Sequence, residues 1–190
     1  GDFSILDEVV PFKDGGEGSI YEHCKRAIER AFHRFSPRGV PLMGDHDWND
    51  GLSAIGNDWK GESFWVGQFL YCILEGFEPI ARRRGDTLFA HKCIDVMETL
   101  KHSINEYGWD GEWYLQATTD EGLKVGSKEN EEGKIFLNPQ LWAVISGIAD
   151  EERAKTAMDN VTKYLLKDYG TLLLQPEFTK GRRDIGYIRE

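Results

Sequence analysis

Residues 44–51 read GDHDWNDG and bring three carboxylates, one side-chain amide and one tryptophan together. A sugar ring has an apolar face of C–H bonds that stacks on an indole ring, and a rim of hydroxyls that exchange hydrogen bonds with carboxylates and amides. Both kinds of contact are available from Asp47, Trp48, Asn49 and Asp50. The cluster therefore predicts a carbohydrate site.

The same cluster has the groups needed to cleave a glycosidic bond. Cleavage requires a carboxylic acid that protonates the leaving oxygen while oxocarbenium character develops on the sugar. Several carboxylates crowded beside an aromatic ring can raise the pKa of one of them, so that this carboxyl group stays protonated. The residue types alone do not decide which aspartate supplies the proton.

Three other interpretations of the cluster were weighed against carbohydrate chemistry. Asp45, Asp47 and Asn49 alternate as in a calcium loop, but Asp50 stands where such a loop requires glycine, and Gly56 where it requires glutamate. Zinc is disfavoured because the five histidines are scattered along the chain. A solvated acidic turn is disfavoured by the length of the surrounding loop. We therefore expect neither a metal nor a cofactor.

The cluster lies in a segment, 36–61, that has no helical periodicity. Connections of this length are uncommon in compact domains, where they are usually binding loops or disordered linkers. Disorder is disfavoured because apolar residues recur along the segment: Val40, Leu42, Met43, Trp48, Leu52, Ile55 and Trp59. We expect an ordered active-site loop between two helices.

Apolar residues at three- and four-residue spacing predict helices over 19–35, 62–84, 86–107, 138–149 and 150–170. Asp86, Asp150 and Asn138, the last followed by proline, are predicted N-caps, and Gly108 is a predicted helix end. The helix over 62–84 is apolar nearly all round, which predicts burial between neighbours.

Between the third and fourth predicted helices the apolar period changes to two. Residues 113–117 and 123–125 alternate on either side of a turn at 120–122, which predicts a small β-hairpin insertion. Short connections between successive helices indicate an all-α fold of helical hairpins. The length of 190 residues favours a single domain over 1–190.

Composition excludes several classes of partner. The net charge of −10 and the isoelectric point near 5.0 argue against a nucleic-acid partner. No stretch is apolar over the roughly 18 residues that a membrane span needs. Cys24, Cys72 and Cys93 lie in apolar helical patterns, and no export signal precedes them, so we expect reduced thiols and a cytoplasmic protein.

Five motifs carry a resemblance to a known family. They are YEHC at 21–24, GVPLMG at 39–44, DWNDG at 47–51, GESFW at 61–65 and NEEGKIFLNPQ at 130–140. Together they resemble the catalytic domain of glycoside hydrolase family 94, in consistent order from about residue 1 to about residue 186. That family holds inverting β-glucoside phosphorylases and the corresponding domain of cyclic β-1,2-glucan synthases.

The resemblance implies specific roles. Asp50 would be the general acid and Trp48 would contact the sugar. Inorganic phosphate, as co-substrate, would attack the anomeric carbon from the face opposite the departing oxygen and release α-glucose 1-phosphate. Because phosphate is already anionic, a second catalytic carboxylate is not required. Glu62 and Gln140 match motif positions, and we expect them either to support the site from behind or to be structural.

The resemblance also implies a fold. The family's catalytic domain resembles an (α/α)6 barrel, whereas five helices are predicted here, so we expect a partial barrel. The family's phosphate-holding region would lie beyond residue 190. Apolar helix faces would then be covered by the remainder of the barrel or by a second copy in a homodimer.

Two other functions stay open. One is a noncatalytic helical module that binds glycans or another chain through the same loop. The other is an inverting glycoside hydrolase, which needs a second carboxylate about 6.5–9.5 Å from the acid to activate water. The candidates for that second carboxylate are Asp45, Asp47, Asp58 and Glu62.

Overall fold

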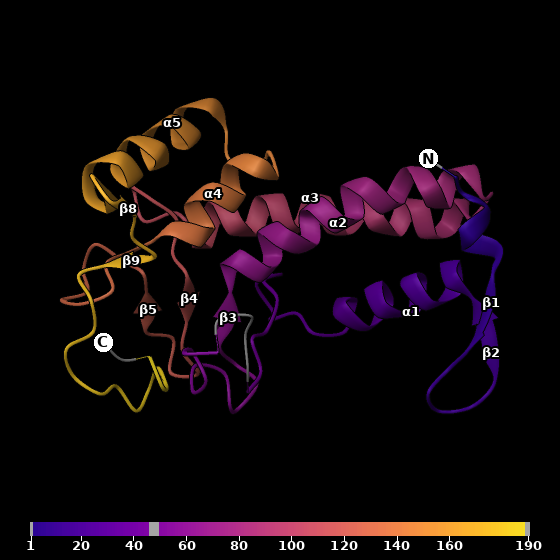
Figure 1. Cartoon of the computed structure of the whole chain (residues 1–190), viewed down its shortest axis with the longest axis horizontal. Coiled ribbons are helices and arrows are strands. Elements are labelled where there is room, and N and C mark those ends of the chain that lie inside the picture. The colour runs from indigo at the N-terminus through magenta and orange to yellow at the C-terminus, as the bar shows by residue number, and fades with distance from the viewer. Residues whose placement is uncertain (1, 46–49, 189–190) are drawn as a thin grey trace. The chain divides into compact units, whose positions relative to one another are not determined.

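The computed structural model describes residues 2–45 and 50–188 (Figure 1). Its contacts divide the chain into two compact units, Gly1–Phe35 and Ser36–Glu190. The regular structure of both units is mainly helical with small strands, in agreement with the predicted helical class. None of the described helices is both long enough and apolar enough to cross a membrane.

The first unit is a β-ribbon followed by one helix. Its elements are η1 (Ser4–Asp7), β1 (Val9–Pro11), β2 (Glu17–Ser19) and α1 (Ile20–Phe32), with β1 and β2 antiparallel. Ser19 and Glu22 form a capping box, in which the Ser19 hydroxyl accepts from the Glu22 N–H at 3.2 Å and the Glu22 carboxylate accepts from the Ser19 N–H at 3.0 Å. The helix predicted over 19–35 is therefore confirmed, with shorter ends.

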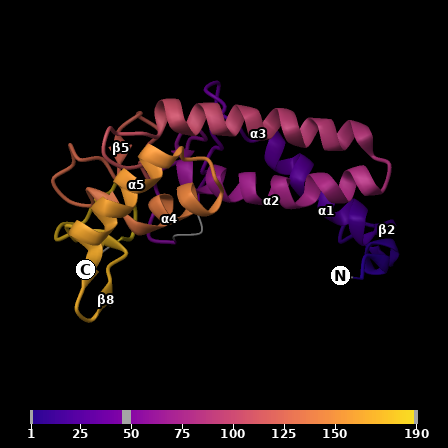
Figure 2. The ribbon, with the colours of Figure 1, turned by 90° about the horizontal axis from the view of Figure 1, so that it is seen from above.

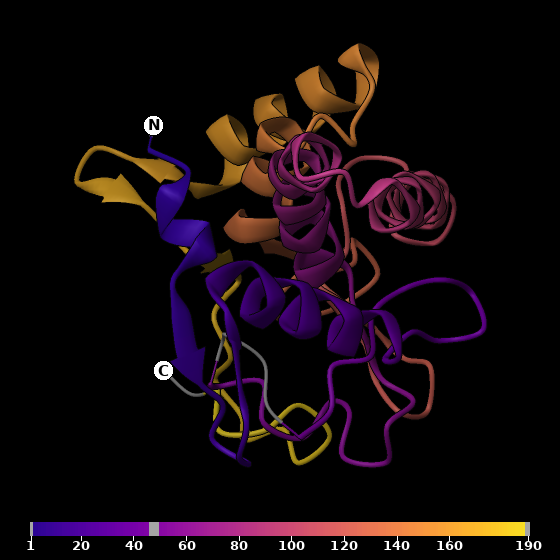
Figure 3. The same ribbon diagram turned by 90° about the vertical axis from the view of Figure 1, so that its right-hand side faces the viewer.

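The second unit is built on a pair of long antiparallel helices. Its α-helices are α2 (Phe64–Arg83), α3 (Thr87–Tyr107), α4 (Leu137–Ile145) and α5 (Glu151–Asn160). Figure 2 shows α2 and α3 side by side, and Figure 3 shows them nearly end-on. The two helices approach closely at Gly67, where an added Cβ would lie 2.8 Å from Ile104 Cδ1. A larger residue at this position would push the pair apart.

The predicted end signals of α3 and α5 are confirmed. The Asp86 carboxylate accepts from the Phe89 N–H at 3.2 Å, and the Asp150 carboxylate accepts from the Arg153 N–H at 2.8 Å. Gly108 follows the last residue of α3. These caps satisfy amide groups that have no partner within the first turn of their helices.

Two predicted helix starts were wrong. Helix α2 begins at Phe64 rather than at Glu62, because Glu62 and Ser63 form strand β3 and Ser63 caps the helix. Helix α4 begins at Leu137, so Asn138 lies inside its first turn rather than capping it. Helix α4 starts at this position because strand β6 (Ile135–Phe136) pairs with β9 (Leu174–Gln175) and keeps the backbone extended up to Phe136.

The fifth helix also ends earlier than predicted. Helix α5 stops at Asn160 and continues as one π-helical segment, η2 (Val161–Leu165). The chain then forms a hairpin from β7 (Leu166–Lys167) and β8 (Gly170–Thr171). Gly170, with φ 141°, therefore begins a strand instead of ending a helix.

The predicted hairpin is confirmed and has a third strand. Strands β4 (Ala117–Thr118) and β5 (Lys124–Val125) pair antiparallel, and β3 (Glu62–Ser63) pairs with the free side of β4. Figure 1 shows these three arrows side by side, with β3 leading into α2. Because β3 directly follows the 36–61 loop, the hairpin and the end of the loop belong to one small sheet.

A hydrophobic cluster joins the loop to this sheet. Its buried members are Met43, Leu52, Ile55, Ala117, Val125, Phe136, Phe178 and Ile185. The loop contributes the first three of these, and its Val40 is also fully buried. The prediction of an ordered loop with its own apolar contacts is confirmed for its described part, although Trp59 is 43% exposed.

Candidate active site

The predicted sugar-binding cluster is only partly within the described residues. Asp47, Trp48 and Asn49 lie outside them. Asp50 lies in a turn with an exposed side chain, and Asp45 on the other side of the cluster is exposed as well. The calcium alternative cannot be assembled from the described residues, since two of its three alternating ligands are Asp47 and Asn49. Among the described residues there is no group of three or more potential metal ligands.

The backbone immediately after Asp50 is held by the C-terminal segment of the chain. The Ile188 N–H donates to the Gly51 carbonyl at 2.8 Å, and the Ala54 N–H donates to the Ile185 carbonyl at 3.1 Å. Gly186 fits between them because it has no side chain: with φ 126°, an added Cβ would lie 2.5 Å from Ser53 N. The position of Asp50 therefore depends on residues more than 130 positions away in the sequence.

A cavity of about 460 Å³ opens next to this segment. Its lining residues are Ser53, Ala54, Asn57, Gly181, Arg182, Arg183, Gly186 and Tyr187. Arg182 is engaged with Asp184 through two hydrogen bonds, of 2.8 and 2.5 Å. The hydrogen bond from this guanidinium lowers the pKa of the Asp184 carboxyl, although partial burial opposes the shift. The cavity thus has polar side chains in its lining, and its nearest lining residue in the sequence, Ser53, comes three positions after the predicted acid.

Glu62 is a structural partner rather than a free carboxylate. Its side chain is only 4% exposed, and Arg38 donates to it from Nε, at 3.1 Å to Oε1, and from a terminal nitrogen to Oε2. The Thr118 hydroxyl donates to Oε2 at 2.9 Å. Both oxygens are therefore occupied by protein donors. Glu62 joins the beginning of the loop, at Arg38, to strand β4.

Gln140 is also structural. It is fully buried on α4, and its carboxamide oxygen accepts from the Tyr114 N–H at 2.8 Å. Its nitrogen donates to the carbonyls of Tyr114, at 2.8 Å, and Phe136, at 2.9 Å. These bonds hold the segment leading into the hairpin against the start of α4. Both Glu62 and Gln140 thus make their hydrogen bonds to other groups of the protein.

Asp120 at the turn of the β4–β5 hairpin was not anticipated as a site residue. Its carboxylate accepts from the backbone N–H groups of Asp58, Lys60 and Gly61, at 2.8 to 2.9 Å. Partial burial alone would raise the pKa of Asp120, but these three donors, together with the Lys60 charge, lower it overall. The sequence around Asp120 indicates only a turn, because its hydrogen-bond partners lie about 60 residues earlier.

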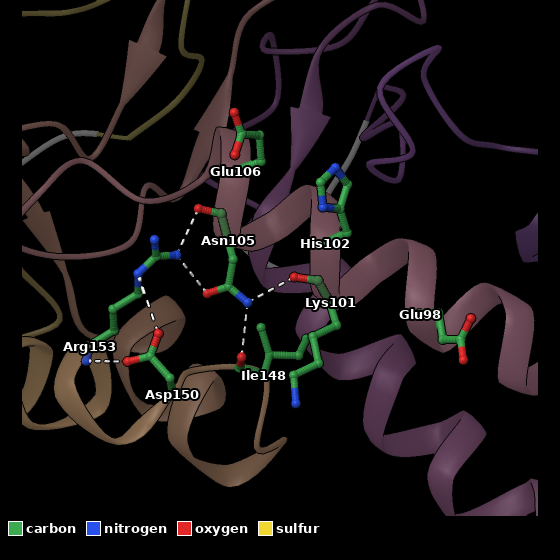
Figure 4. A pocket seen from close by; sticks show the side chains of 8 residues that line it. All are labelled: Glu98, Lys101, His102, Asn105, Glu106, Ile148, Asp150 and Arg153. Atoms are coloured by element: carbon green, nitrogen blue, oxygen red, sulfur yellow. Dashed lines mark hydrogen bonds and ion pairs between the residues drawn. The ribbon is translucent and has the colours of Figure 1, made fainter.

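A second cavity, of about 500 Å³, lies away from the loop between α3 and α5 (Figure 4). Asn105 is central to it: its amide nitrogen donates to the Ile148 carbonyl at 2.9 Å, and its oxygen accepts from the Tyr114 hydroxyl at 2.7 Å and from Arg153 at 3.0 Å. Burial raises the pKa of Tyr114 to about 12, against a weaker opposing effect of Arg153. This network joins structural elements and leaves the Asn105 carboxamide saturated.

The three cysteines are free, as expected. Cys93 is buried, whereas Cys24 and Cys72 are partly buried. Burial raises the pKa of the Cys93 thiol to about 11, with the Glu78 charge adding to the effect. A thiol in this state is a poor nucleophile, so Cys93 belongs to the core and not to a reactive site.

Comparison with known proteins identifies the family to which the chain belongs. The model of the "Glycosyl hydrolase 94 superfamily, catalytic domain" matches residues 1–190. The chain therefore belongs to this superfamily, as its motifs indicated.

Individual relatives are phosphorylases and a glucan synthase. The chain is 40% identical over 189 residues to a solabiose phosphorylase of Paenibacillus borealis, covering 99% of this chain and 25% of that protein. It is 35% identical over 209 residues to a cyclic β-(1,2)-glucan synthase of Rhizobium meliloti, covering 100% of this chain and 7% of the synthase. An N,N'-diacetylchitobiose phosphorylase of Vibrio furnissii is 34% identical, with 99% of this chain and 23% of that protein covered. The chain thus spans a quarter or less of these relatives.

Solved structures support the fold alone. A GH78 family rhamnosidase of Bacillus sp. GL1 superposes with a TM-score of 0.58 at 18% identity, over 75% of this chain and 14% of that one. A rhamnosidase from Klebsiella oxytoca gives a TM-score of 0.55 at 18% identity, over 76% of this chain and 25% of that one.

Proposed function

We propose that this chain carries the general acid of an inverting phosphorylase that acts on β-linked glucosides, and that Asp50 is that acid. The observation that carries the proposal is the DWNDG motif at 47–51, in a chain whose whole length matches the family of disaccharide phosphorylases. Asp47, Trp48 and Asn49 would bind the sugar beside it. The exposed position of Asp50 leaves its carboxyl accessible to a substrate.

The proposed reaction needs one acid and one nucleophile from solution. Phosphate attacks the anomeric carbon as the glycosidic C–O bond breaks, and Asp50 transfers its proton to the departing oxygen. The products are α-glucose 1-phosphate and the shortened acceptor, with Asp50 left as a carboxylate. The engagement of both Glu62 oxygens by Arg38 and Thr118 disfavours this one candidate as a second catalytic carboxylate. No cofactor enters this scheme.

The proposal extends to the fold. We propose that the two units are part of one catalytic domain and contribute part of an (α/α)6 barrel. Support comes from apolar side chains left exposed on α2 and α4: Phe69 at 41%, Ile73 at 37%, Val144 at 42% and Ile145 at 63%. Further helices would cover these side chains and enclose Asp50, and a homodimer is the alternative cover. We place the reaction in the cytoplasm, where free cysteines stay reduced.

The test uses the complete protein that contains this chain. Incubation with cellobiose, diacetylchitobiose or a β-1,2-glucan plus phosphate should release a sugar 1-phosphate, and Asp50→Asn should lower turnover by about 10²–10⁴-fold. Asp45→Asn, on the other side of the cluster, is the matched control and should keep turnover within about threefold. Full turnover in Asp50→Asn would reject the assignment of the acid.

The same assay separates the other functions. Release of free sugar without phosphate would indicate a hydrolase, and a second essential carboxylate would then appear among the Asp45→Asn, Asp47→Asn, Asp58→Asn and Glu62→Gln variants. Tight glycan binding without turnover would indicate a binding module. Each of these results contradicts the phosphorylase proposal.

A further inference from the structure

The turn of the hairpin β4–β5 makes polar contacts with the loop that carries Asp50. At its turn, the Asp120 carboxylate accepts from three backbone N–H groups of the loop, at Asp58, Lys60 and Gly61. The Asp120 N–H donates to the Ile55 carbonyl at 2.8 Å. One residue of the hairpin thus makes four hydrogen bonds to 55–61, and we call this set of contacts the Asp120 clamp.

The Asp120 clamp surrounds a strained residue. Trp59 lies between the bound N–H groups of Asp58 and Lys60, and its φ of 59° is in the left-handed region that non-glycine residues rarely adopt. Such a conformation persists only where surrounding bonds impose it, and it costs about 1–3 kcal/mol. The Asp120 carboxylate supplies the bonds on both sides of Trp59.

The orientation of Trp59 links the clamp to the beginning of the acidic cluster. The indole lies against Gly44, where an added Cβ would be 2.9 Å from its ring. Gly44 precedes the exposed Asp45 and has a φ of 72°. Holding Trp59 in place therefore fixes the backbone that enters the cluster.

The clamp is linked to the other end of the cluster through Ile55. The Ile55 carbonyl is bound by the Asp120 N–H, and its side chain is fully buried together with that of Leu52. Leu52 is two residues after Asp50. Both ends of the segment from Asp45 to Asp50 are thus connected to the same hairpin residue.

We propose that Asp120 is a positioning residue for Asp50: its carboxylate holds the backbone on both sides of Trp59, its N–H holds Ile55, and together these contacts determine where the loop presents the acid. This inference rests on the proposed function of Asp50. Asp120 acts through the backbone and does not touch the substrate. A displacement of about 1 Å in a catalytic group can lower the rate about 10²-fold. The expected signature is therefore a loss of turnover without a matching loss of substrate binding.

The test compares Asp120→Ala and Asp120→Asn with Glu121→Gln in the complete protein. Glu121 is the neighbouring carboxylate on the same turn and accepts from the Thr119 hydroxyl, not from the loop. We expect kcat to fall about 10–100-fold in Asp120→Ala and less in Asp120→Asn, which keeps one acceptor oxygen. KM for the glucoside and for phosphate should stay within about threefold, and Glu121→Gln should match the unsubstituted protein.

Hydrogen exchange gives a second measurement that does not depend on catalysis. Asp120→Ala should increase exchange at the amides of Asp58, Lys60 and Gly61 and in the peptide that spans 45–54, while exchange in α2 and α3 stays unchanged. Unchanged kcat, or a loss of kcat equal to that of Glu121→Gln, would overturn the positioning role. So would increased exchange confined to 58–61.

These measurements distinguish the two proposals. If Asp50→Asn stays fully active, the proposed function fails. Hydrogen exchange in the peptide 45–54 is then the only measurement that tests whether Asp120 positions residues 45–50. If Asp50→Asn is inactive and Asp120→Ala keeps full kcat, only the positioning role fails. If Asp120→Ala does not fold, the milder Asp120→Asn is used instead. The positioning role then requires that kcat falls in this variant while KM stays unchanged.

Discussion

Glu62 and Asp120 hold the same loop by different means. Glu62 is 3% exposed and uses side-chain donors, the Arg38 guanidinium and the Thr118 hydroxyl, to bind the beginning of the loop. Asp120 is partly exposed and uses backbone donors at the end of the loop. Strand β4 is common to both sets of contacts, because Thr118 lies in it and Asp120 follows two residues later.

The difference lies in what each carboxylate fixes. A guanidinium on a long side chain can follow small movements of the backbone, so the Arg38–Glu62 pair holds two segments together without setting their exact path. Backbone N–H groups have no such freedom. Three of them converging on Asp120 determine the dihedral angles of 58–61 directly. We therefore expect Glu62 to matter mainly for stability and Asp120 mainly for the geometry of the loop.

The largest effect on stability is expected for Glu62→Ala. The substitution leaves the Thr118 hydroxyl and part of the Arg38 guanidinium without an acceptor inside the protein. Removing one partner of a buried ion pair costs about 3–5 kcal/mol, and because the Arg38 side chain is 42% exposed we expect about 2–4 kcal/mol here. Chemical denaturation of the complete protein measures this loss of unfolding free energy.

Glu129→Ala is the control for Glu62→Ala. Glu129 is 69% exposed and forms a surface ion pair with Lys124 at 3.8 Å, so its loss should cost less than about 1 kcal/mol. Equal losses of unfolding free energy in the two variants would show that the buried position of Glu62 adds nothing to stability. The assignment of stability to Glu62 and loop geometry to Asp120 would then be wrong.

Asp120 should contribute less to stability, and in a pH-dependent way. Its pKa is below the ordinary value of 3.8, so its stabilisation is fully present above that value and is lost as the pH falls through the lowered folded-state pKa. Because the carboxylate is partly exposed, we expect a difference from Asp120→Asn of only about 1–2 kcal/mol at neutral pH.

The pH dependence is measured as the difference in unfolding free energy between the unsubstituted protein and Asp120→Asn. This difference should be constant from about pH 7 to about pH 5 and should shrink below about pH 4. A difference that grows on acidification has the wrong sign for a carboxylate stabilised in its ionised form, and would exclude the three N–H contacts as its cause.

The sequence reveals Glu62 more readily than Asp120, for a physical reason. Glu62 belongs to a motif, GESFW, next to a strong helical pattern. Asp120 begins the sequence DEG, and turn formation alone explains an aspartate at that position. Long helices such as α2 and α3 are predicted well because their packing repeats every few residues. The three-donor contact at Asp120 has no such repeat.

The errors at helix ends have the same origin. Asn138 and Gly170 are good local signals for a helix start and a helix stop. The pairing of β6 with β9 and the β7–β8 hairpin override both signals. The DWNDG cluster remains a prediction from residue types and from the family resemblance, because the groups proposed to recognise a sugar are neighbours in the sequence. The contacts that hold its loop come from Ile185, Ile188 and Asp120, and only folding brings these near.

The smallest expected effect is that of Thr118→Val, and it tests whether the two carboxylates act independently. Thr118 is 5% exposed and its hydroxyl donates to Glu62 at 2.9 Å, so replacement by an apolar side chain of the same shape should cost about 1 kcal/mol. Because Arg38 still holds Glu62, hydrogen exchange at Asp58, Lys60 and Gly61 should not change. Increased exchange there would mean that the Glu62 contacts also set the path of 58–61, and the division of roles between stability and geometry would have to be abandoned.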